Sequence, residues 1–485
     1  MPDPELPIWR RREAALAALV SALVVLPCWW QPLVQAGDFS SHVYNAWLAK
    51  EIEADRLPGL WLTSQRTNVL FDLLLGELTG LLGWRLGENA AASVLVLVFV
   101  WGAFALASAM SGRRAWPVLP SIAMLAYGWV FHVGFANFYL ALGLCLWALA
   151  LAWRGDIRQL ALAVALLALA ATAHLLPVTW AVSAAVYATA ARALEARGRI
   201  VLGAAAIISI FVARLLLMTR FPTLWALEQA FGLTGTDQVW VYSAKYFVVS
   251  FFLLLFWTLL LLRRVEAEGG RPVLLGIPFQ VYMLTAAVVV LIPTRVDLPQ
   301  YEHALVYISH RMSLAAAVAL VVCLAGARPS KWQLAGLTTL AALFFSFQFV
   351  DARALNELEN RMTEAVRKLP PRQRVISALC DDSSRIDPLV HMVDRVCAGR
   401  CFSYANYEAS TTQFRVRAQA GNGVVVTDYG DSWSMQRGDY EVRSSDLPLF
   451  EISFCAENSQ ELCVRELEAG RKTGRTCGQV TPAWW

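Results

Sequence analysis

Apolar runs of about 17–22 residues recur through the first 350 residues of the chain, and they constrain its fold more than any other feature. A run of that length is what an α-helix needs to cross the hydrocarbon core of a bilayer. Only 16% of the 485 residues are charged, against about a quarter in a typical soluble domain. The sequence therefore predicts an all-α polytopic membrane domain over residues 1–350.

The spacing of these runs predicts about eleven transmembrane helices. Basic residues lie in alternate loops, beginning with Arg10–Arg12 ahead of the first run, so the positive-inside rule places the N-terminus in the cytoplasm. An odd number of crossings leaves the C-terminal tail outside. A signal peptide cleaved after Ala36 is the competing interpretation of the first run. The expected crossings are 14–36, 89–110, 115–131, 135–153, 158–174, 177–194, 200–219, 244–263, 272–293, 310–327 and 333–350.

Residues 37–88 form a long outer loop in this topology. Apolar residues recur at roughly helical spacing over His42–Ile52, which predicts an amphipathic helix lying in the membrane interface. A second apolar stretch, Asn68–Trp84, contains Asp72 and Glu77. Because carboxylates are costly at mid-bilayer, we expect this stretch to lie beside the membrane and not across it.

The polar tail, residues 351–485, contains six of the nine cysteines. Six cysteines in a short polar domain indicate three disulfides in an oxidising compartment, in any of fifteen connectivities, with free thiols in a cytosolic tail as the alternative. We predict a C-terminal extracytoplasmic α+β domain stapled by disulfides, on a multi-pass protein of the cell (inner) membrane. The tail cysteines are Cys380, Cys397, Cys401, Cys455, Cys463 and Cys477, and the expected strands are 413–417, 423–427, 440–443 and 450–454; Cys28, Cys145 and Cys323 lie in apolar runs as packing residues.

The first candidate for chemistry is Asp38, in the segment Gly37–His42 just after the first apolar run. An aspartate before Phe-Ser-Ser is also a good helix N-cap, and the two roles are compatible. His42 follows one helical turn later, so both side chains can share a face. Such a carboxylate could act as a general base toward a hydroxyl group, or bind a metal together with His42.

Further polar residues are expected at the same outer face. Arg66, Asn68 and Asp72 precede or begin the second stretch, where a cation could neutralise a lipid phosphate, or where all three could simply be solvated. His132 and Asn137 flank a short outer turn at Gly134. A lone histidine in an apolar helix is more often a packing residue, and that alternative applies to His132.

The remaining candidates lie in later outer loops. His174 begins one apolar run, and packing is again the alternative role. Arg311 stands at the start of another, where it could either snorkel to the interface or hold the phosphate of a leaving group. The residues grouped with it are Glu302, His303 and His310. In the tail, Asp428–Trp433 mixes acids and aromatics, which fits either a sugar-binding segment or a plain turn.

The order of the early segments resembles the GT-C superfamily of membrane glycosyltransferases, which use polyprenyl-phosphate donors. The resemblance rests on the acid in segment 37–49, the interfacial segment 68–78 and the Leu-Gly-Trp-Arg-Leu-Gly-Glu-Asn segment 82–89 that leads into the second crossing. In that superfamily the first outer-loop acid is catalytic, which by resemblance falls on Asp38. The Lys-Pro-Pro-Leu-Tyr segment of aminoarabinose and O-mannosyl transferases is replaced here by Thr67–Phe71, so no phosphate-binding lysine is carried over.

The resemblance implies a hexosyl or pentosyl transferase of the cell envelope. It would move a sugar from a polyprenyl-phosphate donor to an extracytoplasmic (periplasmic) glycan, lipid or protein acceptor, with Asp38 as general base. No cofactor is certain, and a divalent metal stays open because His132 and Asn137 stand where related enzymes often place an acid. The alternatives are a membrane transporter or lipid flippase, although no internal repeat is evident, and a non-catalytic scaffold. No basic patch indicates a nucleic-acid partner.

Overall fold

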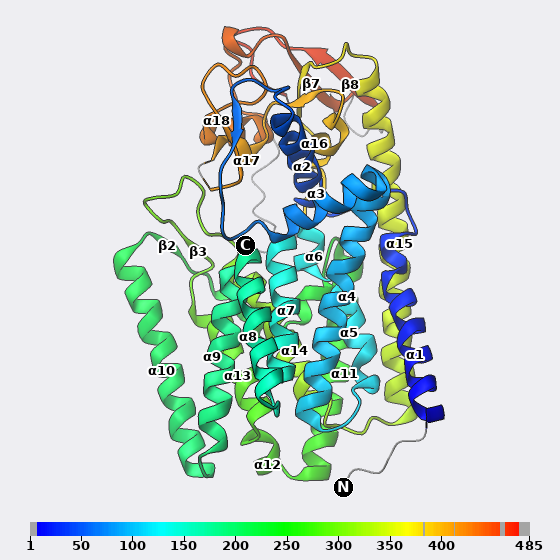
Figure 1. Cartoon of the computed structure of the whole chain (residues 1–485), viewed down its shortest axis with the longest axis vertical. Helices are drawn as coiled ribbons and strands as arrows, with labels where there is room; N and C mark the ends of the chain where they lie inside the picture. The colour runs from blue at the N-terminus through cyan, green and yellow to red at the C-terminus, as the bar shows by residue number, and fades with distance from the viewer. Residues whose placement is uncertain (1–6, 382–383, 412, 456–460, 475–485) are drawn as a thin grey trace.

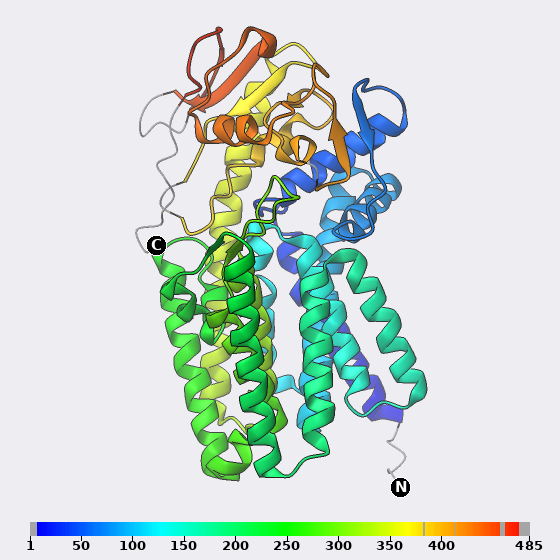
Figure 2. The same cartoon turned by 90° about the vertical axis from the view of Figure 1, so that its left-hand side faces the viewer.

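A computed structural model describes residues 7–381, 384–411, 413–455 and 461–474. Long helices run side by side in a bundle, and short helices, strands and loops cover one end of it (Figures 1 and 2). The bundle contains α1 (Pro7–Val25), α4 (Trp84–Ser111), α5 (Leu119–Ala126), α6 (Trp129–Val133), α7 (Ala136–Ala152), α8 (Ile157–Ala173), α9 (Leu175–Arg192), α10 (Ala196–Arg220), α11 (Ala244–Glu268), α12 (Gly270–Leu274), α13 (Ile277–Leu291), α14 (Ile308–Leu324) and α15 (Lys331–Arg367).

Each interval expected to cross the membrane contains helix, but the expected number of transmembrane helices is not confirmed. Among the described residues, five helices are long and apolar enough to span a bilayer: Trp84–Ser111, Trp116–Val133, Ala196–Arg220, Ala244–Glu268 and Lys331–Arg367. Four shorter apolar helices accompany them: Ala136–Ala152, Ile157–Ala173, Ile277–Leu291 and Ile308–Leu324. The first expected crossing, 14–36, stops being α-helical at Val25, and a short 3-10 turn (Leu26–Cys28) containing Pro27 follows.

Two helices of residues 37–88, the segment expected to form an outer loop, lie at the covered end of the bundle (Figure 1). The helix α2 (Phe39–Glu53) confirms the helix expected at 42–52, but it is buried along its whole first half, from Phe39 to Ala46, so the expectation that it would be amphipathic is wrong. Polar α2 residues can be buried because they have partners; for example, Asn406 Nδ2 donates to Asn45 Oδ1 at 2.8 Å.

The helix α3 (Leu70–Leu82) agrees better with the expectation for residues 68–84. It buries Phe71 and Leu75 and exposes Leu73 and Leu81, which is the pattern of a helix lying along a surface. In Figure 1 it crosses the end of α4 and does not join the bundle. Gly83, at φ 78°, provides the sharp turn between α3 and α4.

The C-terminal region forms a four-stranded sheet in the order β5-β4-β7-β8. β4 runs parallel to both β5 and β7, and β7 pairs antiparallel with β8, with Ile452 opposite Val464. The strands are β4 (Arg374–Ser377), β5 (Phe402–Ser403), β7 (Leu449–Phe454) and β8 (Leu462–Glu466); the helices here are α16 (Met392–Cys397), α17 (Tyr407–Ser410) and α18 (Tyr429–Arg437), with a 3-10 turn at Ser444–Asp446.

The strand predictions were right at one of four places. Residues 450–454 lie in β7, and 413–417 overlap only the start of β6 (Val416–Ala418). Residues 423–427 form no strand. The Asn422 side chain accepts hydrogen bonds from the backbone N–H groups of Val424 and Val425, at 2.7 and 2.9 Å, so these two groups do not pair with a neighbouring strand. Residues 440–443 contribute only the isolated bridge between Glu441 and Lys472.

Two of the three expected disulfides lie among the described residues. They join Cys397 to Cys401 and Cys455 to Cys463. Cys380 is buried, and Cys477 lies outside the described residues. The three cysteines of the apolar runs, Cys28, Cys145 and Cys323, are buried as predicted.

The bundle and the C-terminal region are connected without a flexible linker. α15 is a single helix of 37 residues, so the domain boundary expected at 350/351 falls inside a continuous helix. The outer loop also joins the C-terminal region directly, since β1 (Leu60–Leu62) pairs antiparallel with β6, with Leu60 opposite Ala418. A two-stranded antiparallel sheet of β2 (Thr223–Leu224) and β3 (Arg295–Val296) lies at the same end of the bundle.

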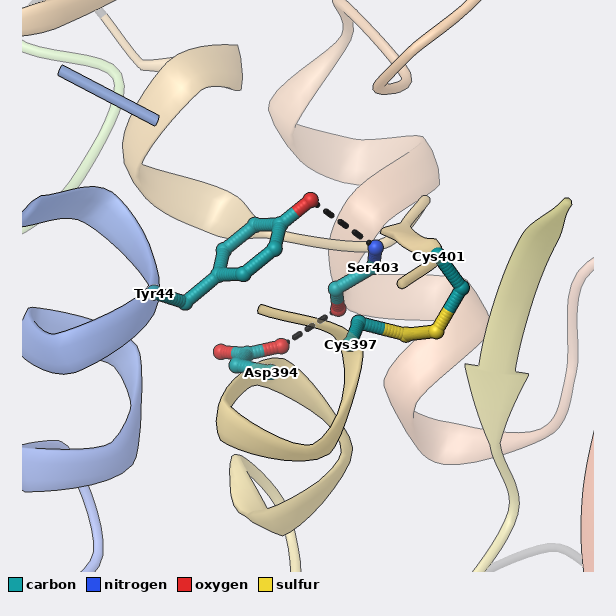
Figure 3. The surroundings of a disulfide bond; sticks show 5 residues. All are labelled: Tyr44, Asp394, Cys397, Cys401 and Ser403. Carbon is teal, nitrogen blue, oxygen red and sulfur yellow. Dashed lines mark hydrogen bonds between the residues drawn. A yellow bond between two sulfur atoms is a disulfide. The ribbon is translucent and has the colours of Figure 1, made fainter. Parts of the chain in front are cut away.

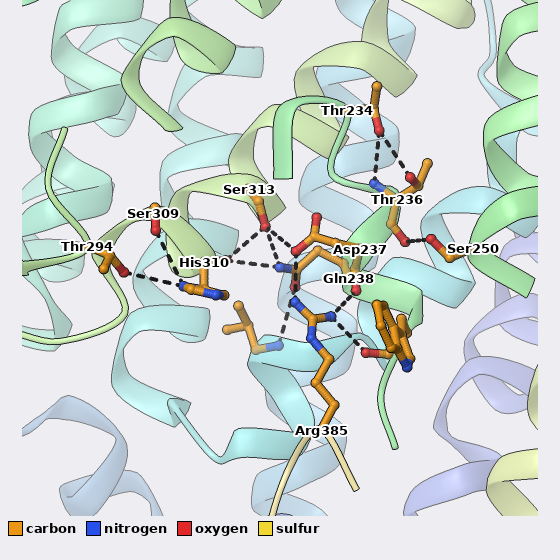
Figure 4. Close-up of polar contacts among 12 residues, drawn as sticks. Thr234, Thr236, Asp237, Gln238, Ser250, Thr294, Ser309, His310, Ser313 and Arg385 are labelled. Atoms are coloured by element: carbon orange, nitrogen blue, oxygen red, sulfur yellow. Dashed lines mark hydrogen bonds and ion pairs between the residues drawn. The ribbon is translucent and has the colours of Figure 1, made fainter. Parts of the chain in front are cut away.

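Arg385 forms one polar joint between the C-terminal region and the bundle (Figure 4). It donates to the backbone carbonyl of Trp240 at 2.8 Å and pairs with the Asp237 carboxylate at 3.3 Å. The Ser313 hydroxyl of α14 donates to the same carboxylate at 3.1 Å. Asp237 lies in the turn Thr236–Val239, which follows a second 3-10 segment, Leu227–Leu233.

Candidate active site

Asp38 lies where the bundle, the outer loop and the C-terminal region meet. Its backbone is fixed by the turn after α6: Gly37 N donates to His132 O and Asp38 N to Val133 O, each at 2.8 Å. This close approach requires Gly134, because a Cβ there would lie 2.6 Å from Asp38 N. The position of the carboxylate is therefore set by two neighbouring loops at the covered end of the bundle.

The Asp38 side chain does not cap α2. Asp38 occupies the N-cap position, but its carboxylate makes no capping hydrogen bond. It is 24% exposed, and its Oδ1 lies 3.4 Å from Nε2 of His391. The carboxylate is therefore available for a role other than helix capping.

His391 ends a chain of polar contacts that comes from the C-terminal region. Its Nδ1 lies 3.2 Å from Asp394 Oδ2, and Asp394 in turn accepts a hydrogen bond from the Ser403 hydroxyl. Figure 3 shows this contact beside the Cys397–Cys401 disulfide, with the Ser403 N–H donating to the Tyr44 hydroxyl of α2 at 3.0 Å. The disulfide and β5 thus fix the Asp394 carboxylate, which orients the His391 imidazole.

Negative charge surrounds the His391 ring. Burial lowers the pKa of His391, but the hydrogen bond and charge of Asp394, with the charges of Asp38 and Glu408, outweigh burial and raise it. The His391 ring therefore lies between two carboxylates, those of Asp38 and Asp394. Burial raises the pKa of the Glu408 carboxyl, and the charge of His42 lowers it. The nearby charges of Asp72, Asp38 and Asp394 raise it further, so the pKa is raised on balance.

Arg311 is the cation that faces this cluster from α14. Its guanidinium lies over the Phe135 ring, 3.9 Å from the centroid, and its Nη1 is 3.2 Å from His174 Nε2. The His174 ring is held by Leu176, whose N–H donates to Nδ1 at 3.1 Å. Arg311 Nε is buried with no hydrogen-bond partner in the part of the chain that the structure describes. Asp38 acts electrostatically on Arg311 without forming an ion pair among the described residues, so the cation can still bind an anion.

His42 pairs with Asp72 and not with Asp38. Its Nδ1 lies 2.6 Å from Asp72 Oδ1, and Asn137 Nδ2 donates to Asp72 Oδ2 at 3.0 Å. Burial lowers the pKa of His42, but the charge and hydrogen bond of Asp72, helped by Glu408 and Asp38, raise it to about 9. His42 and Asp38 therefore do not form the pair of metal ligands that the sequence suggested as one option. His42, Asp72 and Asn137 instead form a support that ties α2 to α3 and α7.

Several aromatic rings pack against one another near Asp38. The Tyr407 ring lies 5.1 Å from His391 and 6.1 Å from His303, and Tyr429 lies 5.4 Å from His303. Tyr307 packs on Phe135, at 5.9 Å, next to Arg311. Asp38 acts electrostatically on His303, Tyr307, Tyr407 and Tyr429. Aromatic faces beside a carboxylate and a cation suit a polyhydroxylated, phosphorylated ligand.

Five of the expected site residues do not join this cluster. His132 is a packing residue: its ring binds Gln35 O, the Tyr242 hydroxyl and Gln348, at 3.0–3.2 Å. His310 is buried against Trp129, 5.3 Å away. Arg66, Asn68 and Glu302 have no hydrogen bond or ion pair with Asp38 among the described residues, and Arg66 and Glu302 are exposed.

Sequence reasoning missed His391, Asp394, Tyr407 and Glu408, which lie more than 350 residues from Asp38. Tyr429 lies in the segment 428–433 that was considered for sugar binding, and Asp428 caps α18 by accepting from Asp431 N at 2.8 Å. No local signal marks His391, because its partner Asp38 is distant in sequence. Within the described ranges, no group of three or more His, Cys, Asp or Glu side chains is arranged to hold a metal ion.

Comparison of the chain with protein-family models, with curated proteins and with solved structures finds no match. The residues and their geometry therefore carry the functional argument.

Proposed function

We propose that this protein is a membrane glycosyltransferase that uses a sugar linked to a polyprenyl phosphate and acts at the outer face of the cell membrane. The observation that carries the proposal is the Asp38 carboxylate, which caps no helix, is partly exposed, lies 3.4 Å from His391 Nε2 and interacts electrostatically with Arg311. Partly unsatisfied charges gathered at one point of a fold are typical of functional sites.

The proposed topology has eleven crossings, a cytoplasmic N-terminus and an extracytoplasmic C-terminal region. The alternate basic loops support it, as do the two disulfides, which persist in oxidising compartments. The bundle then delivers a lipid-linked donor to the end where Asp38 lies, and the C-terminal region covers that end. The acceptor would be an extracytoplasmic glycan, lipid or protein.

The proposed chemistry is an inverting transfer. Asp38 accepts the proton of the acceptor hydroxyl while its oxygen attacks the anomeric carbon, and the bond from that carbon to the donor phosphate oxygen breaks. The electron pair leaves with the polyprenyl phosphate, whose charge Arg311 neutralises. His391, held by Asp394, keeps Asp38 oriented, and Tyr407 and His303 provide aromatic faces for a sugar.

The test is transfer of radiolabelled sugar from polyprenyl-phosphate donors by the purified protein. We expect Asp38→Asn to reduce transfer by about 10²–10⁴-fold, the usual contribution of a general base, with thermal stability unchanged. Asp428→Asn is the matched control, because Asp428 is also an N-cap aspartate but lies in α18 with its cap bond made. A chelator in a parallel reaction tests for a metal. Full transfer by Asp38→Asn would reject the assignment.

A further inference from the structure

An apolar groove opens in the bundle far from Asp38. It has a volume of about 580 Å³, including the part open to the surface, and lies between α4, α7, α9, α13 and α14. Small and aliphatic side chains form its walls, among them Leu149, Ala185, Ala188 and Ala319. Only about 60 Å³ of this space is enclosed closely enough to hold water-sized molecules, so the groove is shallow and open.

The groove lies at the end of the bundle opposite the candidate active site. α7 begins at the Asp72 contact through Asn137 and ends at Ala152, which lines the groove. α9 likewise begins beside Arg311, through His174, and ends at Arg192 in the groove wall. The two sites are separated by the length of these helices, so the groove is not part of the Asp38 cluster.

Positive charge and an unsatisfied donor lie at the end of the groove. The Arg192 guanidinium lies over the Trp153 ring, 4.0 Å from the centroid, and Arg154 acts electrostatically on it. The indole Nε1 of Trp153 is buried with no hydrogen-bond partner among the described residues. No ion pair joins either arginine to a carboxylate in the described part of the chain, although the exposed Glu195 follows Arg192 and the exposed Asp156 follows Arg154.

We propose that this groove binds an acyl chain of an anionic phospholipid, with the phosphate held by Arg192 and Arg154. The apolar walls match a hydrocarbon chain, and the paired arginines complement one negative headgroup at the position where the chain would end. The Trp153 indole, with an apolar body and a polar edge, suits that boundary. The site needs only a bundle that lies in a bilayer, so it is independent of the proposed transferase activity.

The test is native mass spectrometry of the full chain in neutral detergent with phosphatidylglycerol or phosphatidylcholine. We expect retention of phosphatidylglycerol to exceed that of phosphatidylcholine, and Arg192→Gln to reduce it by about fivefold, the effect of one basic contact with an anionic lipid. Arg271→Gln is the control, because Arg271 is an exposed arginine of α12 that does not line the groove.

The variant Ala185→Leu tests the contribution of the lipid's acyl chain separately from that of its headgroup. It fills a partly exposed wall position of the groove, so it should reduce retention of both lipids without loss of helical circular dichroism. Inorganic phosphate and glycerol phosphate should not raise the melting temperature as phosphatidylglycerol does. Wild-type retention of phosphatidylglycerol in both variants, or equal stabilisation by inorganic phosphate, would overturn the proposal.

Discussion

Two clusters of buried charge lie where the C-terminal region meets the bundle, and they are built differently. Around Arg395 of α16 every charge has a partner: its guanidinium binds Glu359 of α15 at 2.6 and 2.7 Å, Glu88 of α4, and the Val34 carbonyl at 2.9 Å. Gln35 completes the set by donating to Glu359 at 2.7 Å. Around Asp38 the contact with His391 is longer, at 3.4 Å, and Arg311 makes no ion pair with the carboxylate among the described residues.

This difference indicates that the Arg395 cluster has a structural role, as a joint between segments, whereas the Asp38 cluster is a candidate functional site. Burying charge costs several kcal/mol per ion unless the partners satisfy it, and the Arg395 cluster does so completely. Such a cluster fixes three segments in one geometry and leaves no group free to react. The Asp38 cluster keeps a carboxylate and a cation incompletely satisfied, which is stable only if the surrounding fold holds them. A ligand would complete it.

The largest expected effect is on the joint. Arg395→Met leaves Glu88 and Glu359 buried without their counter-ion, which should lower the free energy of unfolding by about 3–5 kcal/mol. Arg353→Met on the same helix as Glu359 is the control, since its pair with Glu357 is exposed and should be worth less than about 1 kcal/mol. Thermal unfolding in detergent measures both. Equal small losses would mean that the Arg395 cluster is not a joint.

The site should respond in the opposite way. Arg311→Gln removes a poorly satisfied cation, so the melting temperature should stay constant or rise while transfer falls by about 10²–10³-fold. The loss should lie mainly in kcat if the guanidinium acts on the leaving phosphate. A fall in stability like that of Arg395→Met, with the activity of the remaining folded protein unchanged, would mean that Arg311 has a structural role and not a role in transfer.

How much of this could be predicted from the sequence depends on the range of the signal. Apolar runs are local, and each run contains helix where it was predicted, although the first helix ends at Val25 and not near residue 36. Asp38 was also found locally, as an acid just after an apolar run. His391 and Arg395 could not be, because their partners, Asp38, Glu88 and Glu359, are brought to them only by tertiary packing.

The burial of α2 was missed for the same reason. Its residues 39–46 mix polar and apolar types, and sequence alone reads that as one face toward water. The polar residues are instead satisfied by partners distant in sequence, Asp72 for His42 and Asn406 for Asn45. Polar residues in a helix therefore do not reveal whether they face solvent or a partner.

A third prediction concerns pH and the support beneath the site. Because the pKa of His42 is raised to about 9 in the folded protein, its pair with Asp72 stabilises the fold fully below about pH 6.5, the unfolded value, and this stabilisation is lost as the pH rises through 9. The effect is at most about 3 kcal/mol. Wild type should therefore lose its advantage over His42→Gln between pH 6.5 and 9 in thermal unfolding. A constant difference across that range would contradict the charged pair.

The smallest effect compares two aspartates at helix N-caps. Asp428 accepts the N–H of Asp431 at 2.8 Å, so Asp428→Ala should lower the free energy of unfolding by about 1 kcal/mol. Asp38 makes no such bond, so Asp38→Ala should cost α2 little, and its effect should appear in transfer activity instead. Thermal unfolding of both variants under one condition decides between the roles. If Asp38→Ala destabilises as much as Asp428→Ala, the carboxylate contributes to capping in solution, and the contrast between a satisfied joint and an open site becomes weaker at its central residue.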